Sequence, residues 1–186
     1  MEVISYLFFT HFLADYPFQP GALVAYKKRS FLGVLLHSTV HLLFATLILF
    51  PFWSLWQVWL SVGIIFGTHV CIDQTKVWLE KNSPRKTHFT IYLLDQFTHL
   101  AVITLVSLTL MRDLLIPSAG SFMAFFSDRT VIHFFLVLVL ATYVYDITSW
   151  TYRNVKNPHP YKRNYSLMAR NALIIVIAFV LYWISR

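Results

Sequence analysis

Histidine and aspartate recur in pairs, four residues apart, in the first half of the chain. Residues four apart share one face of a helix, with their side chains about 5–6 Å from each other. Four successive apolar segments each carry one such pair, so each segment presents two potential ligands on one face. The pairs are His11 and Asp15, His37 and His41, His69 and Asp73, and Asp95 and His99.

These side chains suit a divalent metal ion. Imidazole nitrogen and carboxylate oxygen are ligands of zinc, manganese and iron, and facing helices of a bundle can hold such ions. More candidates are present than a structural zinc site needs, which leaves room for one or two ions. We therefore expect one or two Zn, Mn or Fe ions, with these ligands: His11, Asp15, His37, His69, Asp73, Asp95 and His99. The single cysteine, Cys71, excludes a cysteine-based metal motif.

The elements that must position these residues are membrane helices. Of the 186 residues, 58% are hydrophobic and only 12% are charged, too few for the surface of a soluble domain. A helix needs about 20 apolar residues to cross the hydrocarbon core. Five runs are long enough, at residues 31–52, 55–77, 89–111, 130–152 and 167–184. We expect an all-α, polytopic membrane helix bundle, with residues 1–186 forming a single transmembrane domain. Its His/Asp site lies in residues 1–105, and helices 130–152 and 167–184 complete the bundle.

A shorter apolar run, residues 3–16, precedes these five and is followed by Pro17 and Pro20. Proline removes a backbone donor and disfavours helix in the residue before it. We therefore expect a short or re-entrant N-terminal helix in addition to the five full spans. Irregular backbone at membrane depth is tolerated only beside protein or a polar cavity, so this break also suggests a cavity.

Lysine and arginine are concentrated in the loops at residues 27–29, 81–86 and 153–163. The alternate loops, at residues 51–54 and 112–129, hold only Arg112 and Arg129. The positive-inside rule places the first set of loops in the cytoplasm. This arrangement accounts for the net charge of +7 and argues against nucleic acid as a partner.

Three residues are candidates for a catalytic role. Asp15 or Asp95, if not needed as a ligand, could act as a general base. Lys76 lies three residues after Asp73, so it could neutralise Asp73 or bind an anionic substrate. A further carboxylate, Asp146, has no partner four residues away and could reach the same cavity.

Four more residues are candidates for substrate binding, in addition to Lys76. Gln19 lies just beyond the proline break, and Lys27 and Lys28 lie in a basic turn suited to a lipid headgroup. Gln96 adjoins Asp95 but points about 100° away around the helix, so it should have a different role or partner.

Four motifs follow one another in the first half of the chain. They are His11-x3-Asp15-x3-Gln19, Leu35-Leu36-His37, Thr68-His69-x2-Ile72-Asp73-x2-Lys76 and Leu93-Leu94-Asp95-Gln96-x2-His99. Together they resemble a bacterial membrane family known as the domain of unknown function 3307 family, over residues 1–105. The resemblance implies a small helical protein of the bacterial inner membrane. His41 matches no motif position, so its loss should cost less metal than the loss of His37.

These features predict a metal-dependent membrane-embedded hydrolase acting on an amphiphilic lipid substrate, with a phosphoester as the preferred bond. A looser likeness to membrane-bound metal-dependent hydrolases agrees with this reading. The alternative is a transporter or channel for a cation or small metabolite, because a helix broken near the ligands is typical of transport sites. A metal-sensing membrane component with a closed site is a third hypothesis. The expected partners are membrane lipid and a small-molecule or lipid substrate.

Overall fold

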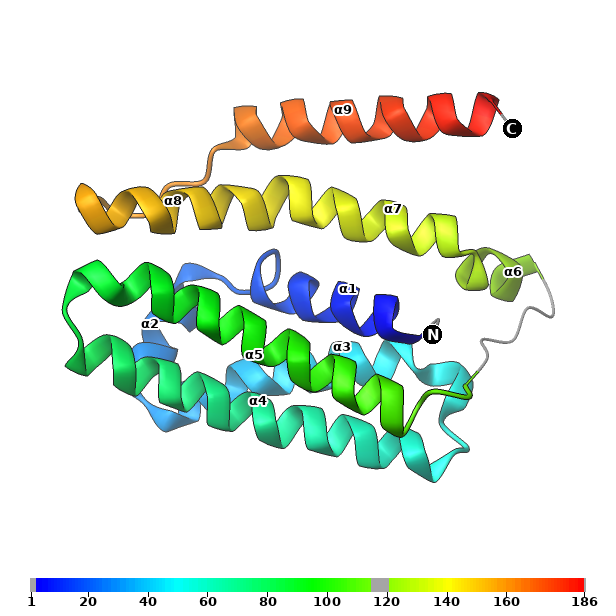
Figure 1. The fold of residues 1–186 in the computed structure, drawn as a ribbon, viewed down its shortest axis with the longest axis horizontal. Helices are drawn as coiled ribbons and strands as arrows, with labels where there is room; N and C mark the ends of the chain where they lie inside the picture. The colour runs from blue at the N-terminus through cyan, green and yellow to red at the C-terminus, as the bar shows by residue number, and fades with distance from the viewer. Residues whose placement is uncertain (1–2, 115–120, 186) are drawn as a thin grey trace.

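The computed structural model describes residues 3–114 and 121–185, and every regular element within them is helical (Figure 1). This confirms the all-α class expected from the sequence. Part of the expected external loop, residues 115–120, lies outside the described residues. The helices are α1 (Val3–Asp15), α2 (Gly21–Arg29), α3 (Phe31–Ile48), α4 (Trp56–Asn82), α5 (His88–Thr109), α6 (Ser121–Ser127), α7 (Arg129–Val139), α8 (Tyr145–Lys156) and α9 (Tyr165–Ile184). A π-helical turn, Leu140–Val144, makes α7 and α8 continuous.

Four helical stretches are long and apolar enough to cross a membrane: Phe31–Ile48, Arg85–Thr109, Arg129–Lys156 and Tyr165–Ile184. They correspond to four of the five expected runs. The remaining run, residues 55–77, lies within α4, a continuous helix of 27 residues. Polar residues such as His69 and Asp73 make α4 less apolar than the other four. A count of five full spans is therefore not confirmed by length and apolarity.

The first helix is short, as the proline break predicts. With 13 residues, α1 is roughly 20 Å long, less than the roughly 30 Å of a hydrocarbon core. It packs against α3, α5 and α7, so helices from both halves of the chain lie beside it (Figure 1). After Asp15 the chain turns, with the Phe18 amide donating to the Leu13 carbonyl at 3.1 Å. Asp15 is thereby placed inside the bundle instead of at its surface.

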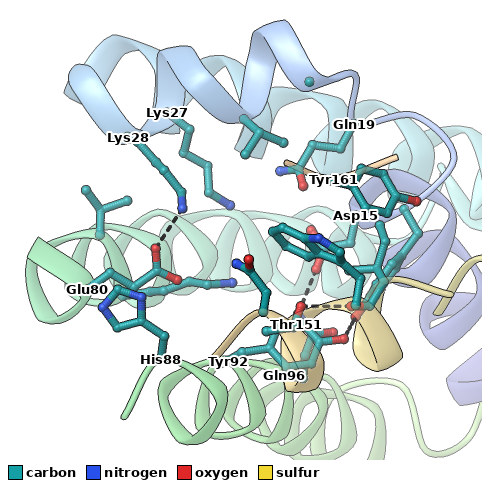
Figure 2. A pocket seen from close by; sticks show the side chains of 18 of the residues that line it. Asp15, Gln19, Lys27, Lys28, Glu80, His88, Tyr92, Gln96, Thr151 and Tyr161 are labelled. Carbon is teal, nitrogen blue, oxygen red and sulfur yellow. Dashed lines mark hydrogen bonds and ion pairs between the residues drawn. The ribbon is translucent and has the colours of Figure 1, made fainter. Parts of the chain in front are cut away.

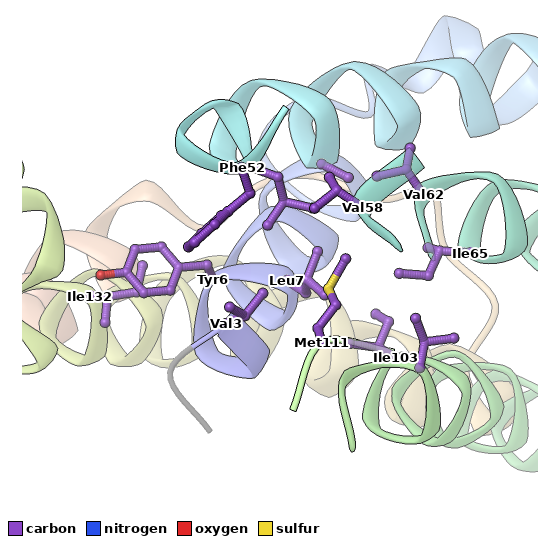
Figure 3. Packing of buried hydrophobic residues seen from close by; sticks show 13 residues of the cluster. Val3, Tyr6, Leu7, Phe52, Val58, Val62, Ile65, Ile103, Met111 and Ile132 are labelled. Carbon is purple, nitrogen blue, oxygen red and sulfur yellow. The ribbon is translucent and has the colours of Figure 1, made fainter. Parts of the chain in front are cut away.

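Apolar side chains close one end of the bundle (Figure 3). The first turns of α1 supply Val3 and Leu7, which pack against residues of α4, α5 and α7. Leu7, Leu49 and Met111 are among the most completely buried side chains. Burial of apolar area contributes about 25 cal/mol per Å², so this cluster is a major source of stability for the helix packing.

The basic loops lie together at the opposite end of the bundle. The segment around α2, the α4–α5 connection and the end of α8 are at one end, whereas the α3–α4 connection and both chain ends are at the other (Figure 1). This separation agrees with the two sets of loops distinguished by their lysine and arginine content.

A close approach of α2 to α3 depends on Gly33. A Cβ atom at this position would lie 2.5 Å from the backbone of Tyr26 and 2.6 Å from the Lys27 nitrogen. Ser30 is the N-cap residue of α3, and its side chain accepts a hydrogen bond from the Leu32 amide at 3.1 Å. These contacts hold α2 against α3 and direct Lys27 into the bundle.

We expect Gly33→Ala to destabilise the protein, because the added methyl group meets backbone atoms that cannot rotate away. Overpacking of this kind costs about 1–3 kcal/mol. Thermal unfolding of the detergent-purified protein should show a clear fall in Tm. Gly63→Ala is the matched control, since its added Cβ would meet nothing within 4 Å. Equal Tm values for the two variants would contradict the tight α2–α3 contact.

Candidate metal centre

The four His/Asp pairs converge in the middle of the bundle. They come from α1, α3, α4 and α5, and all their residues are buried except Asp15, which is partly exposed to a cavity. The histidine rings lie close together: ring centroids are 3.8 Å apart for His41 and His69, 4.2 Å for His69 and His99, and 5.1 Å for His11 and His99. All seven ligands expected from the sequence are therefore brought into one cluster.

Asp15 receives hydrogen bonds from two neighbouring helices. Its Oδ1 atom lies 3.0 Å from His37 Nε2 and 3.1 Å from His41 Nε2, both on α3. Its Oδ2 atom accepts from Gln96 Nε2 of α5 at 2.9 Å and lies 3.6 Å from His11 Nε2. Bonds from buried donors to a carboxylate are strong, so Asp15 ties the end of α1 to α3 and α5.

The other two carboxylates are each neutralised by a lysine. Lys27 Nζ donates to Asp73 at 2.8 Å, and Lys76 Nζ donates to Asp95 at 2.6 Å. The expectation that Lys76 could neutralise Asp73 is therefore corrected: that role belongs to Lys27, from α2. The cause is the packing of α4 against α5, which places Asp95 within reach of Lys76.

Several ligand atoms in the cluster have no hydrogen-bond partner. They are Nε2 of His11, His69 and His99 and Oδ1 of Asp95. For His99 the other nitrogen, Nδ1, lies 2.8 Å from the Asp95 carbonyl oxygen and donates to it, so the lone pair of Nε2 faces its neighbours. Buried polar atoms without partners are rare in folded proteins, and a bound ion is one explanation for them.

Two groups in this cluster could hold a metal ion. In the first, Asp15, His37, His41 and His69 each offer a ligand atom, all within 4.8 Å of one another. In the second, His69, Asp73 and His99 do the same. The donor set of imidazole and carboxylate fits a divalent transition metal, which would displace the protons that bridge these atoms. His69 belongs to both groups.

The positions of His41 and Lys27 differ from the expectation, and that of Gln96 differs in part. His41, which matches no motif, is as close to Asp15 as His37 is. Lys27, taken as a headgroup-binding residue, is buried on Asp73. Gln96 has a separate partner, as expected, in Asp15, but it also donates to Asp95 at 3.1 Å.

A cavity of about 400 Å³ lies between the cluster and the basic end of the bundle (Figure 2). Asp15, Gln19, Lys76 and Gln96 line its inner part, so the cluster reaches the cavity through Asp15. Gln19 Nε2 also lies 3.0 Å from His37 Nδ1. Ligand pockets typically have volumes of about 300–1,000 Å³, so the cavity is large enough for part of an organic substrate.

Further lining residues were not found by sequence reasoning. Tyr16 and Tyr92 join across the cavity wall through their hydroxyl groups at 2.6 Å, and Tyr92 reaches Thr148 at 2.7 Å, which links α1, α5 and α8. Other lining residues come from the α4–α5 connection, the start of α5, α8 and the loop after α8: Arg85, His88, Trp150, Asn154, Tyr161 and Arg163. No spacing rule connects them, because they meet only when α8 packs on α5.

The family model described as "Protein of unknown function (DUF3307)" matches residues 3–121, nearly two thirds of the chain. The chain therefore belongs to this family, which confirms the resemblance drawn from the motifs. The match contains the whole His/Asp cluster and stops before α7, α8 and α9. Neither the curated proteins nor the solved structures include a match.

We expect Lys27→Met to destabilise the protein far more than Lys28→Met. The Lys27 side chain is 9% exposed and its Asp73 partner 2%, so its removal leaves a buried charge uncompensated, at a cost of about 3–5 kcal/mol. Lys28 pairs with Glu80 at 3.0 Å but is 59% exposed, and such surface pairs contribute about 0–1 kcal/mol. Thermal unfolding of both variants in detergent tests this; similar Tm values would contradict the structural role of Lys27.

We expect detergent-purified protein to contain a divalent metal, and His69→Ala to remove most of it, because His69 belongs to both ligand groups. His37→Ala and His41→Ala should lose similar amounts, in contrast to the ranking from the motifs. Mass spectrometry of metal content checks both statements. His133→Ala is the control, since His133 contacts Ser5 at 3.0 Å outside the cluster. Full metal content in His69→Ala would refute the ligand assignment.

Proposed function

We propose that this member of the DUF3307 family is a metal-dependent, membrane-embedded hydrolase acting on an amphiphilic, phosphate-bearing lipid. The observation that carries the proposal is the position of Asp15. This carboxylate belongs to a group of potential metal ligands and also lines a cavity that leads to the basic end of the bundle. A potential metal centre beside a substrate-sized cavity is the arrangement that metal-assisted hydrolysis requires.

One or two Zn, Mn or Fe ions would be held by the buried histidines and aspartates. Such an ion lowers the pKa of a coordinated water and polarises a phosphoryl oxygen. The proposed ligands are those expected from the sequence together with His41, which belongs to the same ligand group as Asp15: His11, Asp15, His37, His41, His69, Asp73, Asp95 and His99. His11 and Asp95 lie outside the two ligand groups and are kept because each has a buried atom without a hydrogen-bond partner.

Asp15 is the better candidate for the general base, with the ion then held by the remaining residues of the ligand assignment. Of the two carboxylates considered, Asp15 lines the cavity, whereas Asp95 lies behind Lys76. In the hydrolysis, water adds to phosphorus and the phosphoester P–O bond breaks. The proton lost by the water passes to Asp15 and then to the leaving alkoxide, so that an alcohol and a phosphate are released. Lys76 lines the cavity next to Tyr92, where it would stabilise negative charge on the phosphoryl group.

The substrate assignment rests on charge and location. The cavity is lined by cationic side chains of Lys27, Lys28, Lys76, Arg85 and Arg163 and by the carboxylates of Asp15 and Glu80. An excess of positive charge in a confined space favours an anionic group. The helices around it expose many large apolar side chains, among them Leu93, Leu94 and Phe97 on α5. A lipid with a phosphate headgroup combines both properties.

The proposed membrane topology rests on the distribution of basic residues and on helix length. We place the basic end of the bundle in the cytoplasm and α4 as a fifth span, because its 27 residues are roughly 40 Å long. The chain would then be a single domain of the bacterial inner membrane, with the cavity opening towards the cytoplasmic face.

Transport of a cation or small metabolite is the second candidate. It is favoured by the buried Lys27–Asp73 and Lys76–Asp95 pairs, since paired ionisable groups inside a membrane bundle often mark transport pathways. The apolar cluster around Leu7 and Met111 argues for hydrolysis, because it closes the bundle beyond the histidines within the described residues. A cavity open at one end suits a reaction better than passage.

We expect detergent-purified protein to release inorganic phosphate from phosphatidic acid, and a chelator such as EDTA to abolish the release. Asp15→Asn should lower the rate by about 10²–10⁴-fold, the usual contribution of a general base. Asp113→Asn, which changes an exposed loop carboxylate, is the matched control. Phosphate release that is insensitive to EDTA and to Asp15→Asn would refute hydrolysis at this site. An inactive protein that moves metal ions into proteoliposomes would favour transport.

A further inference from the structure

The second half of the chain forms one wall of the cavity. Trp150 and Asn154 of α8 line it, as do Tyr161 and Arg163 of the loop that follows. The family match ends at residue 121, so this wall is built by a part of the chain beyond the match. The His/Asp cluster and the opposite wall therefore come from the matched half, and the facing wall comes from the other half.

Arg163 is held on this wall by two tyrosines. Its guanidinium carbon lies 5.1 Å from the centre of the Tyr143 ring, within the range of a cation–π contact. It also interacts with the hydroxyl group of Tyr161. A guanidinium group in contact with aromatic rings keeps its charge and loses side-chain freedom, which prepares it to bind an anion.

A buried carboxylate holds Tyr161 in turn. The Tyr161 hydroxyl donates to Asp146 Oδ2 at 2.7 Å, and Asp146 is only 2% exposed. Burial and this hydrogen bond raise the pKa of Tyr161 to about 12, so the phenol stays protonated and remains a donor. This pairing supplies the partner that the sequence did not reveal for Asp146. The three residues form a chain from the helix interior to the cavity.

Tyr143 connects Arg163 with the part of the bundle around α1. Tyr143 packs against the cluster formed by Phe12, Tyr16 and Val139. Tyr16 directly follows Asp15 in the chain, and both Asp15 and Arg163 line the cavity. Arg163 therefore lines the same cavity that the His/Asp cluster reaches through Asp15.

The charge of Arg163 is not shared with a carboxylate in the described ion pairs, whereas each of the three cavity lysines is ion-paired. Lys27, Lys28 and Lys76 each form an ion pair, with Asp73, Glu80 and Asp95 respectively. The contacts that the structure gives Arg163 are with uncharged tyrosines. The planar guanidinium group matches two oxygens of a phosphate, and such charge-assisted pairs are among the strongest hydrogen bonds in proteins.

We propose that Arg163, positioned by Tyr161 and Asp146, is the phosphate-binding residue of the substrate site in this cavity. The ligand class is a phosphate monoester, carried by a lipid headgroup or by a small soluble molecule. This inference rests on the proposed function for the reaction that the bound phosphate undergoes. The binding itself depends only on the cavity wall.

Isothermal titration of the full chain in detergent tests the proposal. The probes are dihexanoyl phosphatidic acid, inorganic phosphate and dihexanoylglycerol, which lacks the phosphate. We expect Arg163→Gln to weaken binding of the phosphatidic acid by about tenfold or more, the usual effect of losing a charged hydrogen bond. Arg163→Lys should recover part of the affinity because it keeps the charge. Lys162→Gln, at an exposed neighbour that does not line the cavity, should stay within about twofold of the wild type.

Two further measurements separate positioning from folding. Tyr161→Phe removes the hydroxyl group that positions Arg163 and should weaken phosphatidic acid binding several-fold. Arg163→Gln leaves the Tyr161–Asp146 hydrogen bond in place, so its loss of binding should occur at an unchanged Tm. Phosphatidic acid bound more tightly than inorganic phosphate identifies the lipid as the source of the ligand. Equal affinities for these two probes, both lowered in Arg163→Gln, support a soluble phosphate ester. Equal binding of dihexanoylglycerol and phosphatidic acid, or full affinity in Arg163→Gln, would overturn the proposal.

Metal content and phosphate release, measured on the same samples, separate this proposal from the proposed function. The protein could bind phosphatidic acid through Arg163 and yet contain no metal and release no phosphate. That result supports the phosphate site and refutes the hydrolase. Alternatively, Arg163→Gln could keep normal metal content, normal phosphate release and full phosphatidic acid binding. That result supports the hydrolase and refutes the role of Arg163.

Discussion

The burial of three carboxylates and five imidazoles inside one helix bundle is the constraint on which the rest of the structure depends. A charge in a medium of low polarity is costly unless it is paired and hydrogen-bonded. Asp73 is paired with Lys27, and Asp95 is paired with Lys76. Asp15 instead accepts hydrogen bonds from imidazole and amide donors. These contacts determine where α2 lies, how α4 and α5 are aligned, and how deeply α1 enters the bundle.

The same constraint separates the bundle into three levels along its axis. Apolar side chains around Leu7 close one end, the His/Asp cluster occupies the middle, and a cavity with basic walls lies at the other end. A short α1 makes this possible, because it fills the apolar level and ends at Asp15, where the cavity begins. The His/Asp cluster thus borders the cavity on one side and apolar side chains on the other.

The two halves of the chain contribute unequally to the site. All His/Asp pairs lie in the half matched by the DUF3307 model, which therefore carries the groups capable of metal chemistry. The other half adds the wall with Tyr161 and Arg163, which would contact the substrate and not the metal. Under the proposed function, the matched half would supply the metal chemistry and the other half would select the substrate.

The sequence alone was sufficient for the helical class, four candidate membrane spans, the short first helix and the seven expected His and Asp residues of the cluster, five of which belong to a group that could hold a metal ion. These features depend on local rules: apolar length determines a span, and a spacing of four residues places two side chains on one helix face. Only the tertiary structure revealed that Lys27 pairs with Asp73, that His41 joins a group of potential ligands, and that Arg163 lines the same cavity as Asp15. Lys27 and Asp73 are 46 residues apart, and Tyr161 and Arg163 reach the cavity from beyond α8. Contacts of this kind depend on how helices pack against one another, and no local periodicity in the chain encodes that packing.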